Sequence, residues 1–493
     1  MSEPTAVAEH VDVLIVGAGI SGIGAAYHLG QQRPDTSYVV LETQAGFGGT
    51  WRTHTYPGIR SDSDLHTFGY RFKPWRNAPI ASAEEIMTYL GEVIDENDLA
   101  RRIRYEHAIT DATWSSDESR WTLEVTHTAS GERLRFTTNF LWMCQGYYRH
   151  SKGYTPDWEG IDEFAGQIVH PQTWPDNLDY VDKNVVVIGS GATAATLIPA
   201  LADDCAHVTM LQRSPTYFAT GRNINELVEM LREIGIDEAW VHEIARRKIL
   251  HDQNQFMHRA ADEPEEVKQE LFGAIREYLG DDYDIEKHFG PAYRPWQQRV
   301  AFVPDGDLFK GIASGKASVV TDEIVRFNEA GIDLASGEHL DADIITATGF
   351  NLNVLGDIAF TIDGKPLDFH QTVAYRGAMF TGIPNMAWVF GYFRASWTLR
   401  ADMIADFVCR LLAHMDELGA TAVTPTLRPD DAGMVLSPWV DPENFNPGYL
   451  LRGLHLLPQQ GDLEPWTHKQ DYWVEKDELP AADLDDGTLV YTP

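Results

Sequence analysis

The stretch VDVLIVGAGISGIGAAYHL, residues 11–29, decides the fold of this chain. Its apolar run at 11–16 predicts a short buried strand, and the residues after the glycine-rich turn GAGISG at 17–22 favour a helix. A second apolar run, YVVL at 38–41, predicts the next strand. Strand, glycine turn, helix and strand in this order are typical of a parallel-sheet unit that binds a dinucleotide.

Each glycine of this turn has its own physical role. Gly17 permits the tight turn, Gly19 lets a pyrophosphate approach the backbone, and Gly22 lets the helix pack closely on the strand. Ser21 lies at the start of the helix, whose N-terminus faces the phosphates. Glu42 ends the second strand, where a carboxylate can bind ribose hydroxyls. The alternative is a glycine turn in an unrelated α/β fold.

A related unit begins with the strand KNVVVI at residues 183–188. The turn GSGATA follows, with alanine in place of the last glycine, which the pattern permits. The next strand ends in an arginine, Arg213, where an acid is expected. Because a guanidinium pairs with a 2′-phosphate that an acid would repel, Arg213 favours NADPH over NADH; the alternative is a surface arginine. The candidate residues of this second site are Gly189, Ser190, Gly191, Ala192, Thr193, Ala194, Gln212 and Arg213.

The two units predict an α/β chain with two Rossmann-like domains, one for FAD and one for NADPH. Two dinucleotide sites in one chain indicate an internal redox couple, a tightly held flavin and a nicotinamide that delivers hydride. Residues 222–292 have helical apolar spacing and form a helical insertion in the NADPH domain. The expected boundaries are 1–148 for the first part of the FAD domain, 149–221 for the linker and the first part of the NADPH domain, 293–375 for its second part, and 376–493 for the second part of the FAD domain.

Composition excludes several classes of protein. Of 493 residues, 43% are hydrophobic and 23% charged, which is ordinary for a globular protein and unlike a disordered one. The formal net charge of −35 repels nucleic-acid phosphates and anionic lipid, so we expect neither as a partner. The first apolar run is too short for a signal peptide or a membrane span, which favours a cytoplasmic location. Neither a metal-binding spacing nor an oligomeric state can be read from the sequence.

Two long motifs narrow the class further. Residues 164–175, FAGQIVHPQTWP, match FxGxxxHxxxWP through Phe164, Gly166, His170, Trp174 and Pro175. Residues 48–62 match a second pattern, GGxW followed by YPG and an aspartate. Together they resemble the fingerprints of the Baeyer–Villiger monooxygenases, which are class B flavoprotein monooxygenases. Runs such as YPGIRSDSD, MLQRSPTY and ASWTL are similar to the branch of ethionamide-activating monooxygenases, and the resemblance covers nearly the whole chain.

The resemblance implies an activity. NADPH reduces FAD, the reduced flavin and O2 give a C4a-peroxyflavin, and this species attacks a ketone carbonyl to form an ester or lactone. Sulfoxidation of sulfides is also implied. The expected substrates are O2 and a small hydrophobic ketone or sulfide. Such chemistry needs a fixed cation beside the developing oxyanion.

The resemblance also assigns site residues. The cation is Arg299, and Asp62 pairs with it near the flavin; the competing role for Asp62 is a turn or cap residue. Gln298 replaces a lysine that binds the 2′-phosphate in some members, so some NADH use is possible. His170 has a conformational role in the linker. The remaining FAD residues are Gly49, Thr50, Trp51, Arg52, Thr53, Asp62 and Ile109. The remaining NADP residues are Arg60, Ser61, Asp62 and Trp397, of which Trp397 is otherwise a core residue.

Two other hypotheses remain open. An N- or S-oxygenating flavin monooxygenase without ketone activity would have the same fold and cofactors. A FAD-dependent reductase, or a flavin-binding protein without catalysis, is the third hypothesis. The cysteines Cys144, Cys205 and Cys409 are too widely spaced for the redox pair of a disulfide reductase.

Overall fold

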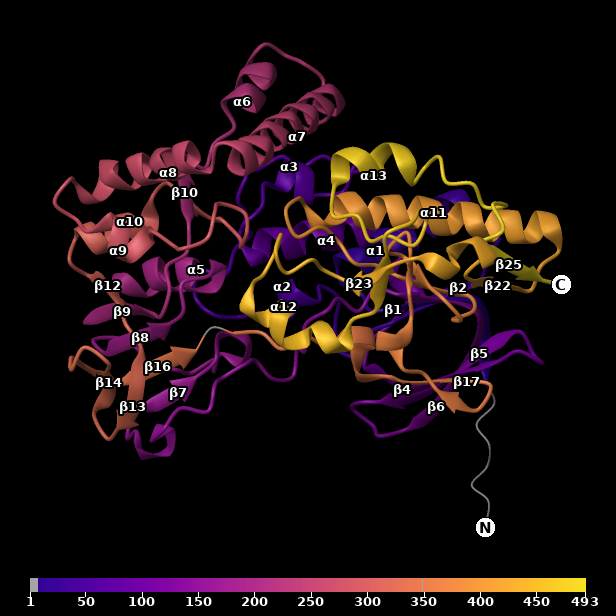
Figure 1. The fold of residues 1–493 in the computed structure, drawn as a ribbon, viewed down its shortest axis with the longest axis horizontal. Helices are drawn as coiled ribbons and strands as arrows, with labels where there is room; N and C mark the ends of the chain where they lie inside the picture. Colours follow the sequence, from indigo (N-terminus) through magenta and orange to yellow (C-terminus); the bar gives the residue numbers. More distant parts are fainter. Residues whose placement is uncertain (1–7, 348) are drawn as a thin grey trace.

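A computed structural model describes residues 8–347 and 349–493, which form two α/β domains that lie side by side (Figure 1). The first sheet is built on β1 (Glu9–Val16), which pairs in parallel with β2 (Tyr38–Leu41) and β6 (Arg133–Met143). β3 (Ile103–Arg104) and β21 (Met386–Trp388) also run parallel in this sheet. Alternate residues of β1 enter two different cores, so the strand is buried on both faces, as its unbroken apolar run predicts.

The same sheet continues through an antiparallel part. β4 (His107–Ser115) pairs with β5 (Arg120–His127), which pairs with β6. Beyond β4 lie β17 (Ala359–Ile362) and β18 (Lys365–Pro366). The expected return of the chain to the first domain at residue 376 is therefore too late. Pairing with β4 holds the segment in the first domain, and Phe360 of β17 also packs edge-on against Trp121, with ring centroids 5.9 Å apart.

Helices cover one face of the first sheet. α1 (Ile20–Gln32) packs along α11 (Trp397–Leu418), and α4 (Ala83–Glu96) lies beside them. α4 begins with a capping box formed by Ser82 and Glu85. The short helix α2 (Thr50–Thr53) lies within the motif at 48–62, and α3 (Leu65–Phe68) follows that motif. These elements place the motif loop at the carboxyl end of the sheet.

The second sheet is wholly parallel, in the order β12 (Ala317–Thr321), β9 (His207–Gln212), β8 (Asn184–Ile188), β16 (Ile344–Ala347) and β7 (Gln167–Val169). α5 (Ala192–Ala202) and α10 (Asp307–Ala313) pack on one face. The sheet β13 (Ile324–Asn328), β14 (Gly331–Leu334) and β15 (His339–Asp341) packs on the other. Residues 149–221, expected to hold the linker and the first part of the NADPH domain, contribute the edge strand β7 ahead of β8.

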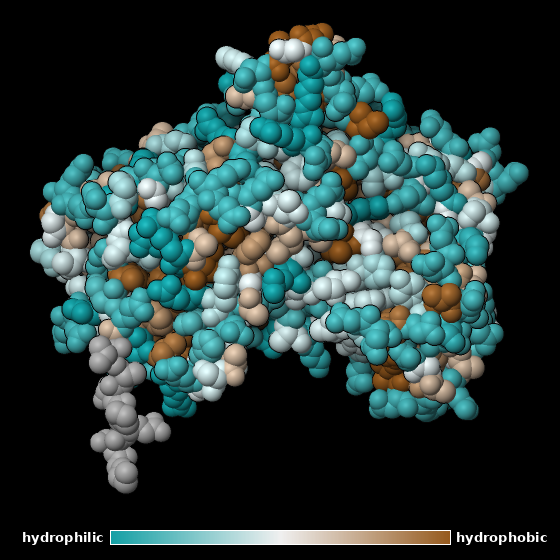
Figure 2. Space-filling model, turned by 180° about the vertical axis from the view of Figure 1, so that it is seen from behind, coloured by the Kyte–Doolittle hydropathy of each residue, from teal (hydrophilic) through white to brown (hydrophobic). Residues whose placement is uncertain are grey.

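The segment predicted as a helical insertion is helical in the structure. It contains α6 (Glu226–Glu233), α7 (Glu238–Asp262), α8 (Pro264–Leu279) and α9 (Ile285–Phe289). α7 also reaches the first domain, because the buried Arg246 donates hydrogen bonds to the carbonyls of His66 and Gly69 at 2.8 and 3.1 Å. The tip of the insertion protrudes and carries exposed apolar side chains, including Trp240, which is 65% exposed (Figure 2).

The remaining elements are short. They are β10 (Phe218–Gly221), β11 (Ala301–Pro304), β19 (Ala374–Tyr375), β20 (Met379–Phe380), β22 (Ala422–Pro425), β23 (Leu436–Pro438), α12 (Gly448–Gly453), β24 (Gln459–Gly461), α13 (Tyr472–Glu478) and β25 (Leu489–Thr492). Within the described ranges, we find no helix that combines the length and the apolar character needed to cross a membrane.

Candidate functional site

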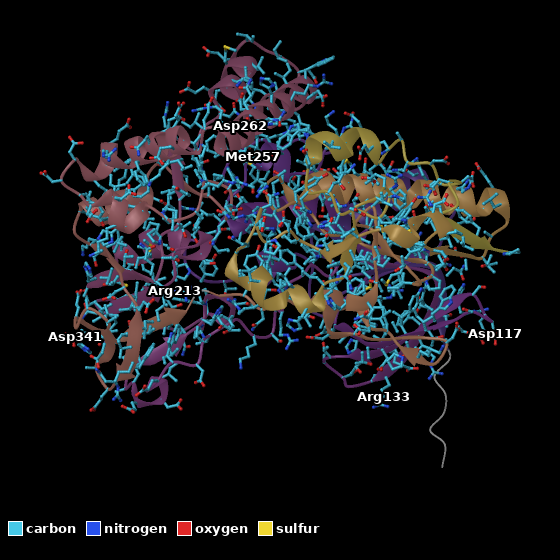
Figure 3. The ribbon with its side chains drawn as sticks, in the orientation of Figure 1. Asp117, Arg133, Arg213, Met257, Asp262 and Asp341 are labelled. Carbon is cyan, nitrogen blue, oxygen red and sulfur yellow. The ribbon has the colours of Figure 1, made fainter. Side chains whose placement is uncertain are left out.

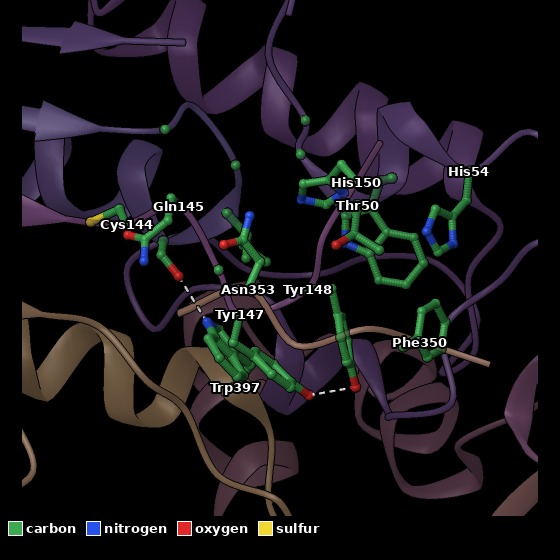
Figure 4. Close-up of a pocket in the computed structure, with 18 of the residues that line it drawn as sticks. Thr50, His54, Cys144, Gln145, Tyr147, Tyr148, His150, Phe350, Asn353 and Trp397 are labelled. Carbon is green, nitrogen blue, oxygen red and sulfur yellow. Dashed lines mark hydrogen bonds between the residues drawn. The ribbon is translucent and has the colours of Figure 1, made fainter. Parts of the chain in front are cut away.

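A cavity of about 470 Å³ lies between the two domains, where the carboxyl ends of β1, β2 and β6 meet the start of α5 (Figure 4). Many of the predicted site residues line it together. They are Gly17, Gly19, Ser21, Glu42, Gly49, Thr50, Trp51, Arg60, Ser61, Asp62, Ile109, Ala192, Thr193, Arg299 and Trp397. The cavity therefore joins the two dinucleotide motifs to the proposed catalytic pair.

The first glycine turn fits a pyrophosphate. A Cβ on Gly22 would lie 1.8 Å from the carbonyl oxygen of Gly17, so the packing of the protein alone requires glycine there. Gly19 differs, because the nearest atom to such a Cβ is the Cα of Gly49, at 3.6 Å. A Cβ at Gly19 would therefore make only ordinary van der Waals contact with the protein, and the N-terminus of α1 carries no side-chain cap among the described residues. This geometry leaves room and backbone N–H donors for phosphate oxygens.

Polar groups at the strand ends also fit a flavin dinucleotide. Glu42 is buried and accepts hydrogen bonds from the backbone N–H groups of Ala18 and Gln44, at 2.7 and 2.9 Å, which fix its direction. Burial raises the pKa of Glu42, and those hydrogen bonds oppose the rise. Gln145, at the end of β6, lines the cavity, and its side-chain amide has no hydrogen-bond partner within 8–347 and 349–493. A ligand with polar ring edges would satisfy this amide. Gln145 is not among the site residues predicted from the sequence.

The residues of α2 have two different roles. Thr50 and Trp51 line the cavity, whereas Arg52 and Thr53 are absent from the lining residues that the structure describes. The Thr53 hydroxyl donates to the Gly49 carbonyl at 2.9 Å and accepts from the Gln44 amide at 2.9 Å. Thr53 thus stabilises the loop that carries Thr50.

Arg299 and Asp62 form the ion pair that the sequence predicts. Their Nη1 and Oδ2 atoms are 2.6 Å apart, and the side chains are 45% and 24% exposed. The Asp62 charge raises the pKa of Arg299 above its ordinary value, although burial opposes the rise. Gly58 lets the loop that carries Asp62 come close to α5. A Cβ at Gly58 would lie 2.6 Å from the Cβ of Ala200 on that helix. The loop can therefore pack directly on the second domain.

Arg60 and Ser61 line the cavity beside Asp62, and both already have partners. Arg60 makes a two-point contact with Asp307 of α10, with Nη2 and Oδ1 3.1 Å apart. The Ser61 hydroxyl accepts from the backbone N–H of Ala81 at 3.2 Å. The Arg60–Asp307 pair ties the motif loop to the second domain.

The second glycine turn repeats the features of the first. Gly189 has a φ of +124°, which favours glycine, while a Cβ on Gly191 would meet no described atom within 4 Å. Ala192 and Thr193 line the cavity; the other predicted residues of this unit are absent from its described lining. The Ser190 hydroxyl bonds to the Thr216 hydroxyl at 2.9 Å, and Ala194 is buried.

The end of β9 carries the predicted NADPH determinants. Gln212 is buried, and its amide donates to the carbonyl of His288 and the hydroxyl of Thr321, at 2.7 and 2.9 Å, so it braces the strand end. Arg213, the next residue, is exposed at the carboxyl end of the sheet (Figure 3), and the ion pairs of the described residues do not involve it. Arg213 is therefore accessible to a phosphate.

An aromatic wall closes one side of the cavity (Figure 4). Trp397 donates from Nε1 to the Ser21 hydroxyl at 2.7 Å and stacks on Tyr147, which places it against the first domain. Tyr148 stacks on Phe350, and Phe350 stacks on His54. Burial lowers the pKa of His54 to about 4. The tyrosines were missed, although they follow the carboxyl end of β6, where ligands of such sheets bind.

The linker motif lies outside the described lining of the cavity. Phe164 and Trp174 are buried in the two cores of the second domain, and Pro175 follows Trp174. A Cβ on Gly166 would lie 2.3 Å from the Asp343 carbonyl oxygen. His170 contacts the Gly349 carbonyl through Nε2 at 2.9 Å, and its Nδ1 accepts from the backbone N–H of Gln172. Burial lowers the pKa of His170, and its contacts tie the linker to the chain after β16.

Acidic, histidine and cysteine side chains do not gather into a metal site anywhere in the described part of the chain. The three cysteines are free and buried.

Comparisons with known proteins agree with this geometry. Residues 15–77 match an NAD(P)-binding Rossmann-like domain, and residues 72–226 match a flavin-binding monooxygenase-like family. The chain is 46% identical over 487 residues to the FAD-containing monooxygenase EthA of Mycolicibacterium smegmatis, covering 98% of this chain and 97% of that protein. It is 43% identical to the FAD-binding monooxygenase AlmA of Acinetobacter baylyi, with 98% and 96% covered.

A solved structure supports the fold. An oxidized steroid monooxygenase bound to NADP superposes with a TM-score of 0.76 at 21% identity, covering 98% of this chain and 99% of that one. The prediction of two dinucleotide-binding domains is thus confirmed, as is the prediction of a flavin-dependent oxidoreductase. The chain belongs to the family of FAD-containing monooxygenases.

Proposed function

We propose that this enzyme uses NADPH and O2 to insert one oxygen atom beside a ketone carbonyl, and that it also converts sulfides to sulfoxides. The observation that carries the proposal is the Arg299–Asp62 ion pair in the cavity between the two dinucleotide motifs. FAD, when bound, supplies the redox chemistry and the activation of O2. The protein supplies binding, orientation and charge.

The charge of Arg299 stabilises the oxyanion that develops on the substrate. Asp62 raises the pKa of Arg299, so the guanidinium stays protonated, and the 2.6 Å contact fixes its position before substrate binds. A preorganised donor of this kind contributes about 2.7–4 kcal/mol to lowering a barrier.

The second domain binds NADPH. The open space at Gly191 and the start of α5 accommodate the pyrophosphate, and the exposed Arg213 pairs with the 2′-phosphate. Gln298 donates to the Asn446 amide oxygen at 3.2 Å, which supports a minor role for it in cofactor choice. The buried free thiols suit a reducing compartment, and we propose a cytoplasmic location.

Product mass spectrometry tests the reaction. The enzyme is incubated with NADPH, isotopically labelled O2 and a panel of simple ketones and sulfides. An ester that carries one labelled oxygen supports the proposal. Labelled sulfoxide, with no ester from any ketone, favours the alternative of an N- or S-oxygenating monooxygenase. A flavin that NADPH cannot reduce favours a binding protein without catalysis.

A further inference from the structure

Two tyrosine rings line the cavity together with Arg299, and a third packs against one of them. Tyr147 and Tyr148 lie in the loop after β6, and Tyr449 comes from α12. The ring centroids of Tyr147 and Tyr148 are 4.0 Å apart, and those of Tyr148 and Tyr449 are 5.6 Å apart. The three phenols and Arg299 influence one another electrostatically. A charged donor, Arg299, and two neutral donors, Tyr147 and Tyr148, therefore line the same cavity.

The hydroxyl of Tyr147 donates a hydrogen bond of 2.7 Å to that of Tyr148 (Figure 4). This bond uses the Tyr147 proton, and the Tyr148 hydroxyl shares a second hydrogen bond with that of Tyr449, which a substrate carbonyl would replace. Burial, and then the neighbouring phenols, raise the pKa of Tyr148 well above its ordinary value. The Tyr148 hydroxyl is therefore protonated at neutral pH.

The ring of Tyr148 is held from both sides. Phe350 stacks on it at 4.5 Å between centroids, with an angle of 28° between the rings. Tyr147 lies on it at 4.0 Å and is itself stacked on Trp397 at 5.2 Å. Trp397 is anchored in turn by its hydrogen bond to Ser21. A donor with so little rotational freedom is preorganised, which is the condition for stabilising charge as it develops.

We propose that the Tyr148 hydroxyl donates a hydrogen bond to the carbonyl oxygen of the substrate beside Arg299, and that Tyr147 is a positioning residue for this donor. The inference rests on the proposed function for the identity of the substrate as a ketone. Two donors of different kinds then converge on one oxygen. Both contacts strengthen as that oxygen gains negative charge.

Ketone binding to the oxidised, FAD-loaded enzyme tests the inference without turnover, because no NADPH is present. The probe is acetophenone with a ¹³C-labelled carbonyl, and its stretching frequency in the bound state is measured by infrared difference spectroscopy. We expect a shift to lower frequency in the wild type. Tyr148→Phe keeps the stacked ring, loses a large part of this shift, and binds the ketone about tenfold more weakly, which is about 1.4 kcal/mol.

Two further variants separate a donor from a structural role. Tyr147→Phe should keep the frequency shift but broaden the band, because Tyr148 loses its orienting partner. Tyr180→Phe, in the second domain and outside the described lining of the cavity, should behave like the wild type. FAD content and the thermal midpoint of every variant confirm that it is folded.

The same frequency and affinity in Tyr148→Phe and the wild type would overturn the inference, as would a wild-type carbonyl frequency equal to that in water. The outcome is distinct from that of the proposed function. A Tyr148-dependent shift in an enzyme that yields no ester supports the donor assignment while contradicting oxygen insertion beside a ketone.

Discussion

The guanidinium of Arg299 lies 2.6 Å from the carboxylate of Asp62, and the two residues come from different domains. Asp62 belongs to the motif loop after α2, and Arg299 precedes β11 in the second domain. The position of the cation is therefore set by the first domain, which carries the flavin motif. A change in the distance between the domains would also displace the charge on which the proposed reaction depends.

Arg299→Ala should uncouple oxygen transfer from flavin reduction. Loss of one preorganised donor lowers the rate of product formation about 10²–10³-fold. FAD content and the anaerobic rate of flavin reduction by NADPH should remain close to wild type, because the cofactor cradles are unchanged. Ester yield and hydrogen peroxide release are measured together. Arg247→Ala, on an exposed part of α7, is the control, and a normal ester yield in Arg299→Ala would remove the assigned role.

Gly19→Ala and Gly22→Ala should impair two different properties, FAD binding and folding stability respectively. A Cβ at Gly22 collides with the Gly17 carbonyl oxygen at 1.8 Å, so Gly22→Ala should lower the thermal midpoint of the apoprotein. At Gly19 the nearest protein atom is 3.6 Å away, so Gly19→Ala should fold normally and lose FAD, because the methyl group occupies the pyrophosphate space. Flavin absorbance and thermal unfolding measure both effects. Normal FAD content in Gly19→Ala would contradict the assignment of the cradle.

Arg213→Ala should change cofactor preference. Loss of a charged hydrogen bond to the 2′-phosphate costs about 1.5–3 kcal/mol, so the KM for NADPH should rise roughly 10- to 100-fold. The KM for NADH should change little, because NADH lacks this phosphate. Steady-state oxidation of each cofactor measures the ratio. An unchanged preference would make Arg213 an ordinary surface arginine.

Interactions of His28 should make stability depend on pH in the alkaline range. Burial of His28 opposes its protonation, but hydrogen bonds with Asp402 and Asp406 outweigh this and raise the pKa of His28 to about 9. A raised folded pKa adds stability that is complete below the unfolded pKa of about 6.5 and is lost as pH rises through 9. The difference in thermal midpoint between wild type and His28→Gln should therefore shrink between pH 6.5 and 9. A difference that is constant with pH would contradict the linkage.

The two glycine turns made most of the fold predictable, because local backbone geometry ties each turn to a strand and a helix. The return of the chain to the first sheet at β17 was not predictable in this way. It depends on the pairing of β17 with β4, two strands that are far apart in sequence. The edge strand β7 was missed for a similar reason, since three residues give too short a pattern.

The prediction of the site is most complete where a sequence motif fixes a loop. It is least complete where the residues that contact the site come from distant segments of the chain. Asp62 and Arg299 were paired from the motif and the resemblance, and they are in contact. The partner of Arg60, Asp307, and the neighbour of Tyr148, Tyr449, lie hundreds of residues away in the chain. Sequence spacing carries no information on such contacts, because tertiary packing alone creates them.

The position of β21 beside β6 has a consequence for synthesis on the ribosome. The strands of the second sheet all lie between residues 167 and 347, so this sheet can be complete while later residues are still being added. The first sheet has to wait for β21, and its covering helix α11 ends at Leu418. The nascent chain therefore leaves the apolar edge of β6 at Leu141–Met143 unpaired until β21 is made. Chaperone capture during this interval should depend on that edge.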